Sequence, residues 1–152
     1  MSDQLIRFVR DHFQTNEFIP LHAPVFPGRE KEYVADTIES TFVSSVGAYV
    51  DRFEQDMANY TCSPKAVATV NGTAALHISL KLAGVEAGDL VITQPLTFVA
   101  TCNAIAYCNA EPVFIDVDRD TLGLSAKALE AWLDEHAKLD SEGVCRTRAD
   151  NK

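Results

Sequence analysis

Three segments decide the fold of this chain: Asn71-Gly-Thr-Ala-Ala-Leu-His77, Asp89-Leu-Val-Ile-Thr-Gln-Pro-Leu-Thr-Phe98 and Pro112-Val-Phe-Ile-Asp116. They read as a turn, a helix, a strand, a second helix and a second strand, with polar residues gathered where the elements end. The preceding run 66–70 is nearly all apolar, which predicts a strand covered on both faces. Strands that alternate with helices predict an α/β fold with a mostly parallel sheet.

Around these segments, apolar residues recur at helical spacing. The pattern predicts helices over 3–14, 29–42, 48–60, 73–83, 98–107 and 126–137, and strands over 66–70, 89–93 and 112–116. The helix at 73–83 is apolar around most of its circumference, so we expect it to be deeply buried. Gly84 is expected to end this helix, and Ser125 to cap the last one.

Composition divides the chain into three parts. Residues 1–60 are expected to form a helical N-terminal arm and lead-in, interrupted by a proline-rich extended segment at 18–28. Residues 61–137 form the first part of the α/β domain. Residues 138–152 are polar and charged without a period, so we expect a disordered chain end or, inside a longer protein, a surface loop.

Bulk composition restricts the class of partner. Hydrophobic residues make up 47% of the chain and charged residues 23%, which is typical of a soluble globular protein. The net charge of -9 argues against nucleic acid and anionic membranes as partners. It leaves room for a small anionic ligand, because a helix N-terminus can bind one inside an acidic protein. No stretch approaches the ~20 apolar residues of a membrane span.

The cysteines bear on the compartment. Cys62, Cys102, Cys108 and Cys145 show no Cys-x-x-Cys spacing, and the start of the chain has no secretory signal. This predicts four free thiols in a reducing cytoplasm and no metal. A zinc site that uses Cys102, Cys108 and a histidine is the alternative.

The turn at Val70-Asn-Gly-Thr-Ala74 is a suitable seat for a phosphate group. Gly72 permits a tight turn after the expected strand, and a helix begins with free N–H groups and the positive end of its dipole. Thr73 adds a hydroxyl donor. The alternative is an ordinary capped helix, for which Asn71 and Thr73 are equally suited. Neither G-x-G-x-x-G nor G-x-x-x-x-G-K-[ST] occurs, so the fingerprints of a dinucleotide fold and of a nucleotide hydrolase are missing.

Two further residues are expected at the same edge of the sheet, because the carboxyl ends of parallel strands lie together. Phe98 follows the strand at 89–93 and could stack on a planar ring, although composition alone favours a place in the core. Asp116 ends the next strand and could bind a ligand. A hydrogen bond to the backbone of its own loop is the favoured role.

The opening segments, together with Ser45-Val-Gly-Ala-Tyr-Val-Asp-Arg-Phe-Glu54, resemble the DegT/DnrJ/StrS family of sugar aminotransferases. The resemblance runs from about Ile19 to Leu133. It implies a fold-type I enzyme that depends on pyridoxal 5′-phosphate, with a large domain of three α/β/α layers and a mostly parallel sheet. This chain would hold the first part of that domain. The similarity is closest to the branch that acts in legionaminic-acid-type sugar pathways.

The resemblance implies cofactor roles for four residues. Gly72, Thr73 and Ala74 match the turn that holds the cofactor phosphate. Phe98 matches the aromatic residue that stacks on the pyridine ring. Asn71 stands where the family often has serine, a small departure from the pattern.

The resemblance also implies substrates and partners. The parent protein would transfer an amino group, with glutamate as the expected donor, to a keto carbon of a nucleotide-linked deoxysugar for polysaccharide or glycan synthesis. Ser45 and Gly47 are expected to shape the entrance for this sugar nucleotide. Family members build the site at a dimer interface, which implies a homodimer.

No catalytic residue is assigned within this chain. Family members carry the Schiff-base lysine and the aspartate that pairs with the pyridine nitrogen farther along, and neither motif occurs before Lys152. None of Lys65, Lys81, Lys127 and Lys138 sits in the family's lysine context, so none is nominated as the catalyst. We expect the 152-residue chain to be inactive alone, since transamination needs that lysine. Two alternatives are a truncated non-catalytic product and a sugar dehydratase or sensor relative that keeps the fold without the lysine.

Overall fold

A computed structural model describes residues 2–149, and the chain forms two compact units, Met1–Asp56 and Met57–Lys152. The first unit is helical, and its last helix continues into the second unit. These helices are α1 (Ser2–Phe13), α2 (Glu30–Glu39) and α3 (Ala48–Thr61). The three helices predicted for the N-terminal arm are therefore confirmed.

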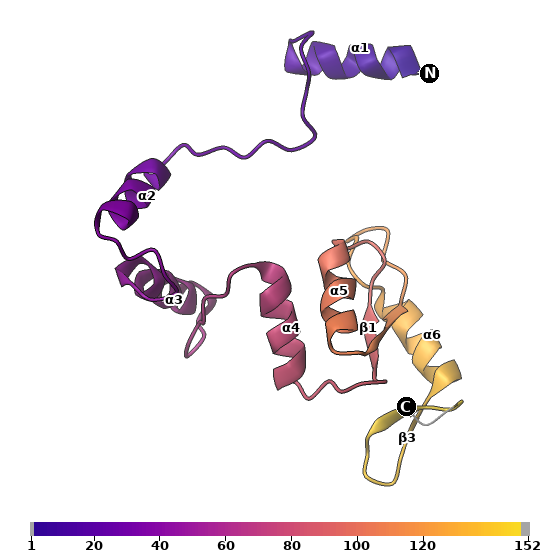
Figure 1. Cartoon of the computed structure of the whole chain (residues 1–152). Helices are drawn as coiled ribbons and strands as arrows, with labels where there is room; N and C mark the ends of the chain where they lie inside the picture. The colour runs from indigo at the N-terminus through magenta and orange to yellow at the C-terminus, as the bar shows by residue number, and fades with distance from the viewer. Residues whose placement is uncertain (1, 150–152) are drawn as a thin grey trace. The chain divides into compact units, whose positions relative to one another are not determined.

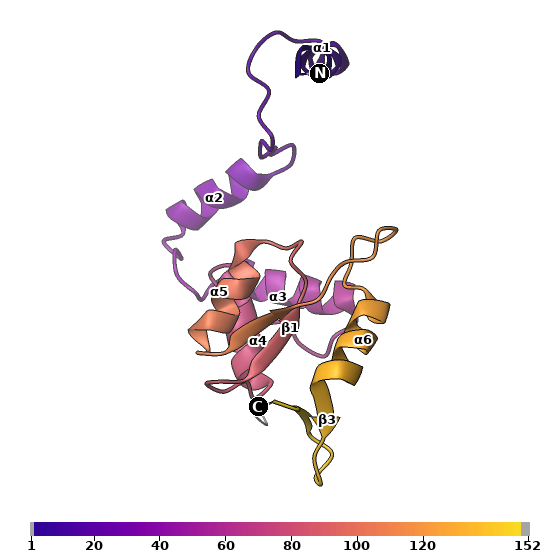
Figure 2. The same ribbon diagram turned by 90° about the vertical axis from the view of Figure 1, so that its right-hand side faces the viewer.

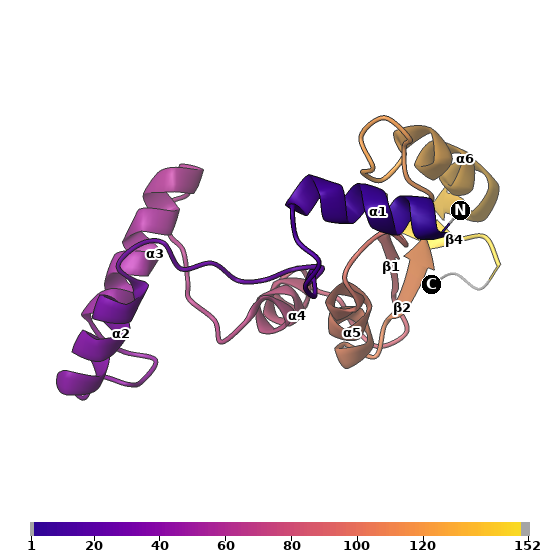
Figure 3. The ribbon, with the colours of Figure 1, turned by 90° about the horizontal axis from the view of Figure 1, so that it is seen from above.

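The second unit alternates helices with strands (Figure 1). Its elements are α4 (Gly72–Leu82), β1 (Leu90–Thr93), α5 (Val99–Tyr107), β2 (Glu111–Phe114), α6 (Ala126–His136), β3 (Ala137–Leu139) and β4 (Cys145–Thr147). β1 and β2 are parallel, with Leu90 opposite Glu111 and Thr93 opposite Phe114. Figure 3 shows these two strands side by side. The crossover between them is α5, so the predicted parallel α/β arrangement is confirmed.

The β1–β2 sheet lies between two helical layers. α4 and α5 pack against each other on one face, and α6 lies on the other side of β1 (Figures 1 and 2). The core fills the space between the sheet and the layer formed by α4 and α5. Its buried members and their partly buried neighbours are Ile105, Cys108, Ala110, Leu80, Val85 and Val91. Burying an aliphatic side chain such as that of Ile105, 1% exposed, contributes about 1.5–3 kcal/mol.

Helices α4 and α5 end in the same way. Gly84 has φ +87°, and its N–H donates to the Lys81 carbonyl at 3.1 Å. The next N–H, of Val85, donates to the Leu80 carbonyl at 3.0 Å. This pair of bonds is a Schellman motif, so Gly84 ends the helix as predicted. Asn109, with φ +55°, takes the same place after α5.

Two predictions about the segment before β1 are wrong. Residues 66–70 belong to neither sheet, and the side chains of Val67 and Val70 are 79% and 88% exposed. A strand requires a neighbour that completes its hydrogen-bond ladder, and apolar composition does not supply one. The helix at 73–83 was expected to be deeply buried. Instead α4 has no buried residue in the described chain, and Leu82 is 84% exposed, because only one side of the helix packs on α5.

An antiparallel hairpin of β3 and β4 forms where residues 138–152 were expected to be irregular. Its turn is held by Asp140, whose Oδ1 accepts hydrogen bonds from the N–H groups of Glu142 and Val144, both at 2.9 Å. Each strand has three residues, which is too short to show the alternating pattern of a strand. The residues of the turn could have indicated the hairpin, but they look like part of a generally polar segment. Residues 150–152 lie outside the described part of the chain.

Candidate functional site

Two helix N-termini and two strand ends meet at one edge of the second unit. α4 and α5 lie side by side, and both begin at the end of the sheet where β1 finishes (Figure 1). A short loop, 94–98, joins Thr93 of β1 to α5, and Asp116 follows β2. The edge therefore collects the turn at 71–74 and the loops after both strands, which is where open α/β sheets bind ligands.

Asn71 caps α4 and shapes the turn. Its backbone is extended (φ −166°, ψ 171°), and its Oδ1 accepts a hydrogen bond from the Ala74 N–H at 2.9 Å. The Asn71 carbonyl accepts from the Ala75 N–H at 3.1 Å. Since the first N–H groups of a helix have no partner inside it, those of Gly72 and Thr73 are left for a ligand within the described chain. They stand at the positive end of the helix dipole.

The space beside Gly72 is open. A Cβ built on Gly72 would meet no described atom within 4 Å, so nothing in the protein requires a glycine there. Thr73, the next residue, is partly buried and carries a hydroxyl that can donate a hydrogen bond. Two N–H donors, a hydroxyl and an open approach together fit a phosphate group. The ordinary capped helix is present as well, because Asn71 caps α4 through the Ala74 N–H. The two readings are compatible, since this cap does not use the N–H groups of Gly72 and Thr73.

Phe98 lies outside the core. Its side chain is 81% exposed, and it stands at the N-cap position of α5 with extended backbone (φ −71°, ψ 139°). It gives the helix no side-chain cap. Its location is therefore not explained by packing among the described residues, and its ring is open to stack on a planar ligand.

Asp116 and His77 have structural roles. The Asp116 Oδ1 accepts a hydrogen bond from the Val117 N–H at 2.8 Å, and its carbonyl accepts from the Ser125 N–H at 2.9 Å. Asp116 thus organises its own loop, as favoured from the sequence. The His77 ring of α4 packs edge-on against Tyr107 of α5, with centroids 5.7 Å apart.

Gln94 is a residue of this edge that the sequence pattern does not reveal. It follows β1 directly, and its Nε2 donates hydrogen bonds to the carbonyls of Leu96 at 2.7 Å and Leu122 at 3.3 Å. The second partner lies 28 residues away, so no local spacing could have indicated this bond.

Ser45 and Gly47 lie in the first unit, in the loop between α2 and α3. Gly47 has φ +150°, and a Cβ there would lie 3.4 Å from Phe42 Cβ. The Tyr49 hydroxyl donates to Asp36 Oδ2 at 2.8 Å, which ties α3 to α2 across this loop. The same hydrogen bond raises the pKa of Tyr49, since it favours the protonated hydroxyl.

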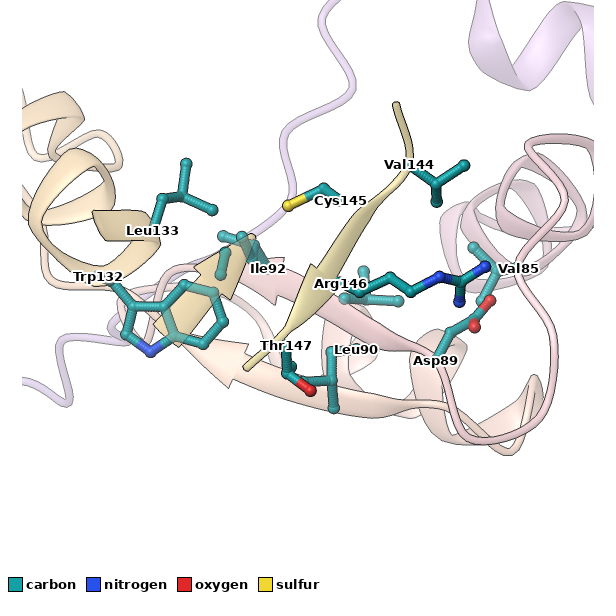
Figure 4. A pocket seen from close by; sticks show the side chains of 12 residues that line it. Val85, Asp89, Leu90, Ile92, Trp132, Leu133, Val144, Cys145, Arg146 and Thr147 are labelled. Atoms are coloured by element: carbon teal, nitrogen blue, oxygen red, sulfur yellow. The ribbon is translucent and has the colours of Figure 1, made fainter. Parts of the chain in front are cut away.

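A cavity of about 350 Å³ lies between β1, α6 and β4 (Figure 4). Its lining is mostly apolar, and Figure 4 shows the Arg146 guanidinium pointing toward Asp89 at one end. Arg146 also donates to Asp140 at 2.7 Å, so its charge serves the hairpin. The cavity contains no residue of the edge where α4 and α5 begin.

Residues 2–149 show neither a metal-binding cluster nor a membrane-spanning helix. No group of three or more His, Cys, Asp or Glu side chains in this part is placed to hold a metal ion. No helix in it is long and apolar enough to cross a membrane. The four cysteines are unpaired thiols, and Cys108 is the buried one.

The sequence profile of the DegT/DnrJ/EryC1/StrS aminotransferase family matches residues 26–139. That span includes the turn at 71–74, Phe98 and both parallel strands. The chain belongs to this family. The resemblance inferred from the sequence motifs is confirmed at the level of the family, and the legionaminic-acid branch stays a prediction.

Curated relatives carry sugar-related names. The GDP-perosamine synthase of Escherichia coli O157:H7 is 38% identical over 122 residues, which cover 80% of this chain and 34% of that protein. The UDP-4-amino-4-deoxy-L-arabinose–oxoglutarate aminotransferase of Shewanella sediminis is 34% identical over 125 residues, covering 82% and 32%. The chain therefore spans about a third of the length of the curated relatives it matches.

Solved structures agree with the fold. The putative sugar aminotransferase Spr1654 from Streptococcus pneumoniae, in its PMP-form, superposes with a TM-score of 0.67 at 32% identity over 76% of this chain and 29% of that chain. Its PLP-form gives 0.64 at 31% identity with the same coverage. The predicted fold class, part of a fold-type I large domain, is confirmed, and so is pyridoxal 5′-phosphate as the cofactor of this family.

Proposed function

We propose that this protein takes part in the pyridoxal-phosphate-dependent transfer of an amino group to a nucleotide-linked keto sugar. The observation that carries the proposal is the edge where α4 and α5 begin. The available N–H groups of Gly72 and Thr73 and the exposed ring of Phe98 lie at the same end of two helices that pack together. A ligand that joins a phosphate to a planar ring matches this pair of features.

The phosphate is proposed to bind the turn before α4. Gly72 and Thr73 donate through their N–H groups, and Thr73 donates through its hydroxyl. The Ala74 N–H is held by Asn71 at 2.9 Å, so a phosphate oxygen competes with the asparagine side chain for it. The dipole of the 11-residue α4 favours the phosphate dianion at this end. Phe98 stacks on the pyridine ring and excludes water from one of its faces.

Pyridoxal phosphate, when bound, supplies the chemistry that carries an amino group from donor to acceptor. The residues of this chain bind and orient it, and we assign none of them as a catalytic lysine or aspartate. The names of the relatives support a nucleotide-linked sugar as acceptor and glutamate, the amino form of oxoglutarate, as donor. Ser45 and Gly47 are proposed to shape the sugar-nucleotide entrance in a cytoplasmic homodimer.

A binding titration tests the cofactor part of this proposal. Pyridoxamine 5′-phosphate is the suitable probe, because it lacks the aldehyde with which pyridoxal phosphate labels surface lysines. Its fluorescence should report saturable binding that weakens about tenfold or more when the ligand lacks the phosphate, the scale of lost charged hydrogen bonds. Equal affinities for pyridoxamine and its phosphate would remove the phosphate seat from the start of α4.

The hydroxyl of Thr73 provides a second readout with a matched control. Thr73→Val should weaken binding of pyridoxamine 5′-phosphate. Thr37→Val removes a helix hydroxyl that bonds back to the Tyr33 carbonyl at 2.7 Å in the first unit, and it should leave binding unchanged. Loss of binding in both variants would point to a general defect rather than to the seat.

A further inference from the structure

Gln94 joins two loops at the edge where Phe98 lies. Its Nε2 donates to the carbonyl oxygens of Leu96 at 2.7 Å and Leu122 at 3.3 Å. Leu96 belongs to the same loop as Phe98, and Leu122 belongs to the loop that follows β2. One partly buried side chain thus connects the two segments that follow the parallel strands.

The chemistry of the partners fixes the orientation of the amide. Both partners are carbonyl oxygens, which accept hydrogen bonds and cannot donate them. Only the NH2 group can face them, and it has one hydrogen for each carbonyl. The opposite orientation would set Oε1 of Gln94 against two other oxygens. The connection therefore depends on the donor capacity of this side chain.

The loop before α5 has hydrogen bonds of its own. The Thr97 N–H donates to the Pro95 carbonyl at 3.0 Å, and the Thr97 hydroxyl lies 3.0 Å from the Thr101 hydroxyl. These bonds shape the backbone just before Phe98. A restraint applied at Gln94 and Leu96 is therefore passed on to Phe98 through a short, ordered segment.

The loop after β2 is ordered as well. The Leu122 N–H donates to the Asp118 carbonyl, and the Asp118 N–H donates to the Gly123 carbonyl, both at 2.8 Å. Leu122 has φ +56°, which is uncommon for a residue with a side chain. Such a backbone persists where its surroundings hold it. The Leu122 carbonyl is thus a fixed point to which Gln94 attaches the other loop.

We propose that Gln94 is a positioning residue for the stacking aromatic, because it holds the Phe98 loop to the loop after β2. The inference rests on the proposed function, since it concerns the ring side of the same site. Phe98 is 81% exposed, so packing does not hold its ring before a ligand arrives. A fixed loop loses less entropy on binding, which raises affinity for the ring of the ligand and leaves affinity for the phosphate unchanged.

Two ligands and three variants test this role in the purified protein. Pyridoxamine 5′-phosphate carries the ring and the phosphate, whereas inorganic phosphate, followed by phosphorus NMR line broadening, carries no ring. Gln94→Met keeps the length of the side chain, loses the donors and adds no charge. Gln94→His restores an N–H donor. Gln4→Met makes the control change on an exposed residue of α1.

We expect Gln94→Met to weaken binding of pyridoxamine 5′-phosphate about three- to tenfold, the range for loss of a neutral hydrogen bond. The circular dichroism induced in the ligand's absorption band should fall, because the ring is held less firmly. Affinity for inorganic phosphate should not change. The affinity of Gln94→His for pyridoxamine 5′-phosphate should be closer to that of the wild type than the affinity of Gln94→Met is. The affinity of Gln4→Met should equal that of the wild type.

Three other results would overturn the inference in different ways. Equal affinity and equal dichroism in wild type and Gln94→Met would show that Gln94 does not position the ring. An equal loss for both ligands would show a general disturbance of the fold. If the wild type binds neither ligand, the proposed function itself fails, which is distinguishable from a failure at Gln94.

Discussion

The carboxamide oxygen of Asn71 accepts a hydrogen bond from the Ala74 N–H at 2.9 Å, and this contact marks the start of α4. It uses one of the free N–H groups at the helix N-terminus and leaves those of Gly72 and Thr73 to a ligand. The cap and the proposed phosphate seat are therefore parts of one turn. Because the cap leaves the N–H groups of Gly72 and Thr73 unused and occupies only that of Ala74, substitutions can test stability and binding separately there.

Asn71→Ala should lower the free energy of unfolding by about 0.5–2 kcal/mol, the usual effect of losing an N-cap side chain. Asn71→Ser should keep most of that free energy, because a serine hydroxyl also accepts from the third N–H of a helix. Urea denaturation measures both. Asn103→Ala, an exposed change inside α5, is the matched control and should not destabilise. An Asn71→Ala midpoint equal to that of the wild type would show that the cap contributes nothing.

Phe98→Ala should weaken ligand binding and leave the stability of the fold nearly unchanged. Removing the ring should weaken binding of pyridoxamine 5′-phosphate by about 1–2 kcal/mol, the scale of an aromatic stacking contact. The free energy of unfolding should change by less than about 0.5 kcal/mol, because the side chain is 81% exposed. Tyr60→Ala, at a residue 87% exposed in the same unit, is the control for binding. Undiminished affinity in Phe98→Ala would remove Phe98 from the site.

The helices could be predicted from the sequence because their determinants are local. Ser125, for example, caps α6 by accepting the Ala128 N–H at 3.3 Å, and both residues belong to one turn. The run 66–70 has the apolar composition of a buried strand, yet neither sheet of the described chain includes it. Pairing depends on a neighbouring strand that the run itself does not encode.

The candidate site was predictable in part for the same reason. The turn at 71–74 and the place of Phe98 after a strand follow from neighbouring residues and from parallel topology. Composition favoured Phe98 in the core, and its exposure follows from its place at the N-cap of α5, which the residue type does not reveal. The bond from Gln94 to Leu122 spans 28 residues, so only the three-dimensional structure could reveal it.

Substitution by alanine should lower stability at Gly47, whereas at Gly72 it should lower phosphate binding and leave stability unchanged. Gly47 has φ +150°, a backbone conformation that residues with a side chain rarely adopt, so Gly47→Ala should destabilise the α2–α3 region by about 1 kcal/mol. A Cβ at Gly72 meets no described atom within 4 Å, so Gly72→Ala should not destabilise α4. It should nevertheless weaken inorganic phosphate binding, because the methyl group narrows the approach to the N–H groups.

Hydrogen exchange of the α2 and α3 amides measures the Gly47 effect, and phosphorus NMR measures the Gly72 effect. Each variant serves as the control for the other, since the two glycines lie in different units. If Gly72→Ala were destabilised and still bound inorganic phosphate as tightly as the wild type, both parts of its prediction would be wrong. The proposed use of this position would then be contradicted.

Asp140 gives the β3–β4 hairpin a dependence on acid pH. Its Oδ2 accepts a hydrogen bond from Arg146 Nε at 2.7 Å, and its Oδ1 accepts from the N–H groups of Val144 and Glu142. The Arg146 bond first, and then these N–H groups, hold the pKa of Asp140 below its usual range. The folded hairpin therefore favours the charged carboxylate. Its contribution to stability is present above the unfolded-state pKa of about 4 and is lost as the pH falls through the lower folded-state pKa.

We expect the Val144 amide resonance to titrate with a midpoint below pH 4, as protonation of Asp140 weakens the hydrogen bond that this N–H donates. Asp140→Asn should abolish that titration and loosen the hairpin already at neutral pH, because the neutral amide accepts more weakly from the Arg146 guanidinium. Asp134→Asn on α6 changes a carboxylate outside this turn and should leave the Val144 titration in place. A Val144 midpoint at or above the ordinary carboxyl pKa would mean that Arg146 and the turn N–H groups do not favour the charged form of Asp140. The hydrogen bonds of Asp140 would then not explain a dependence of the hairpin on pH.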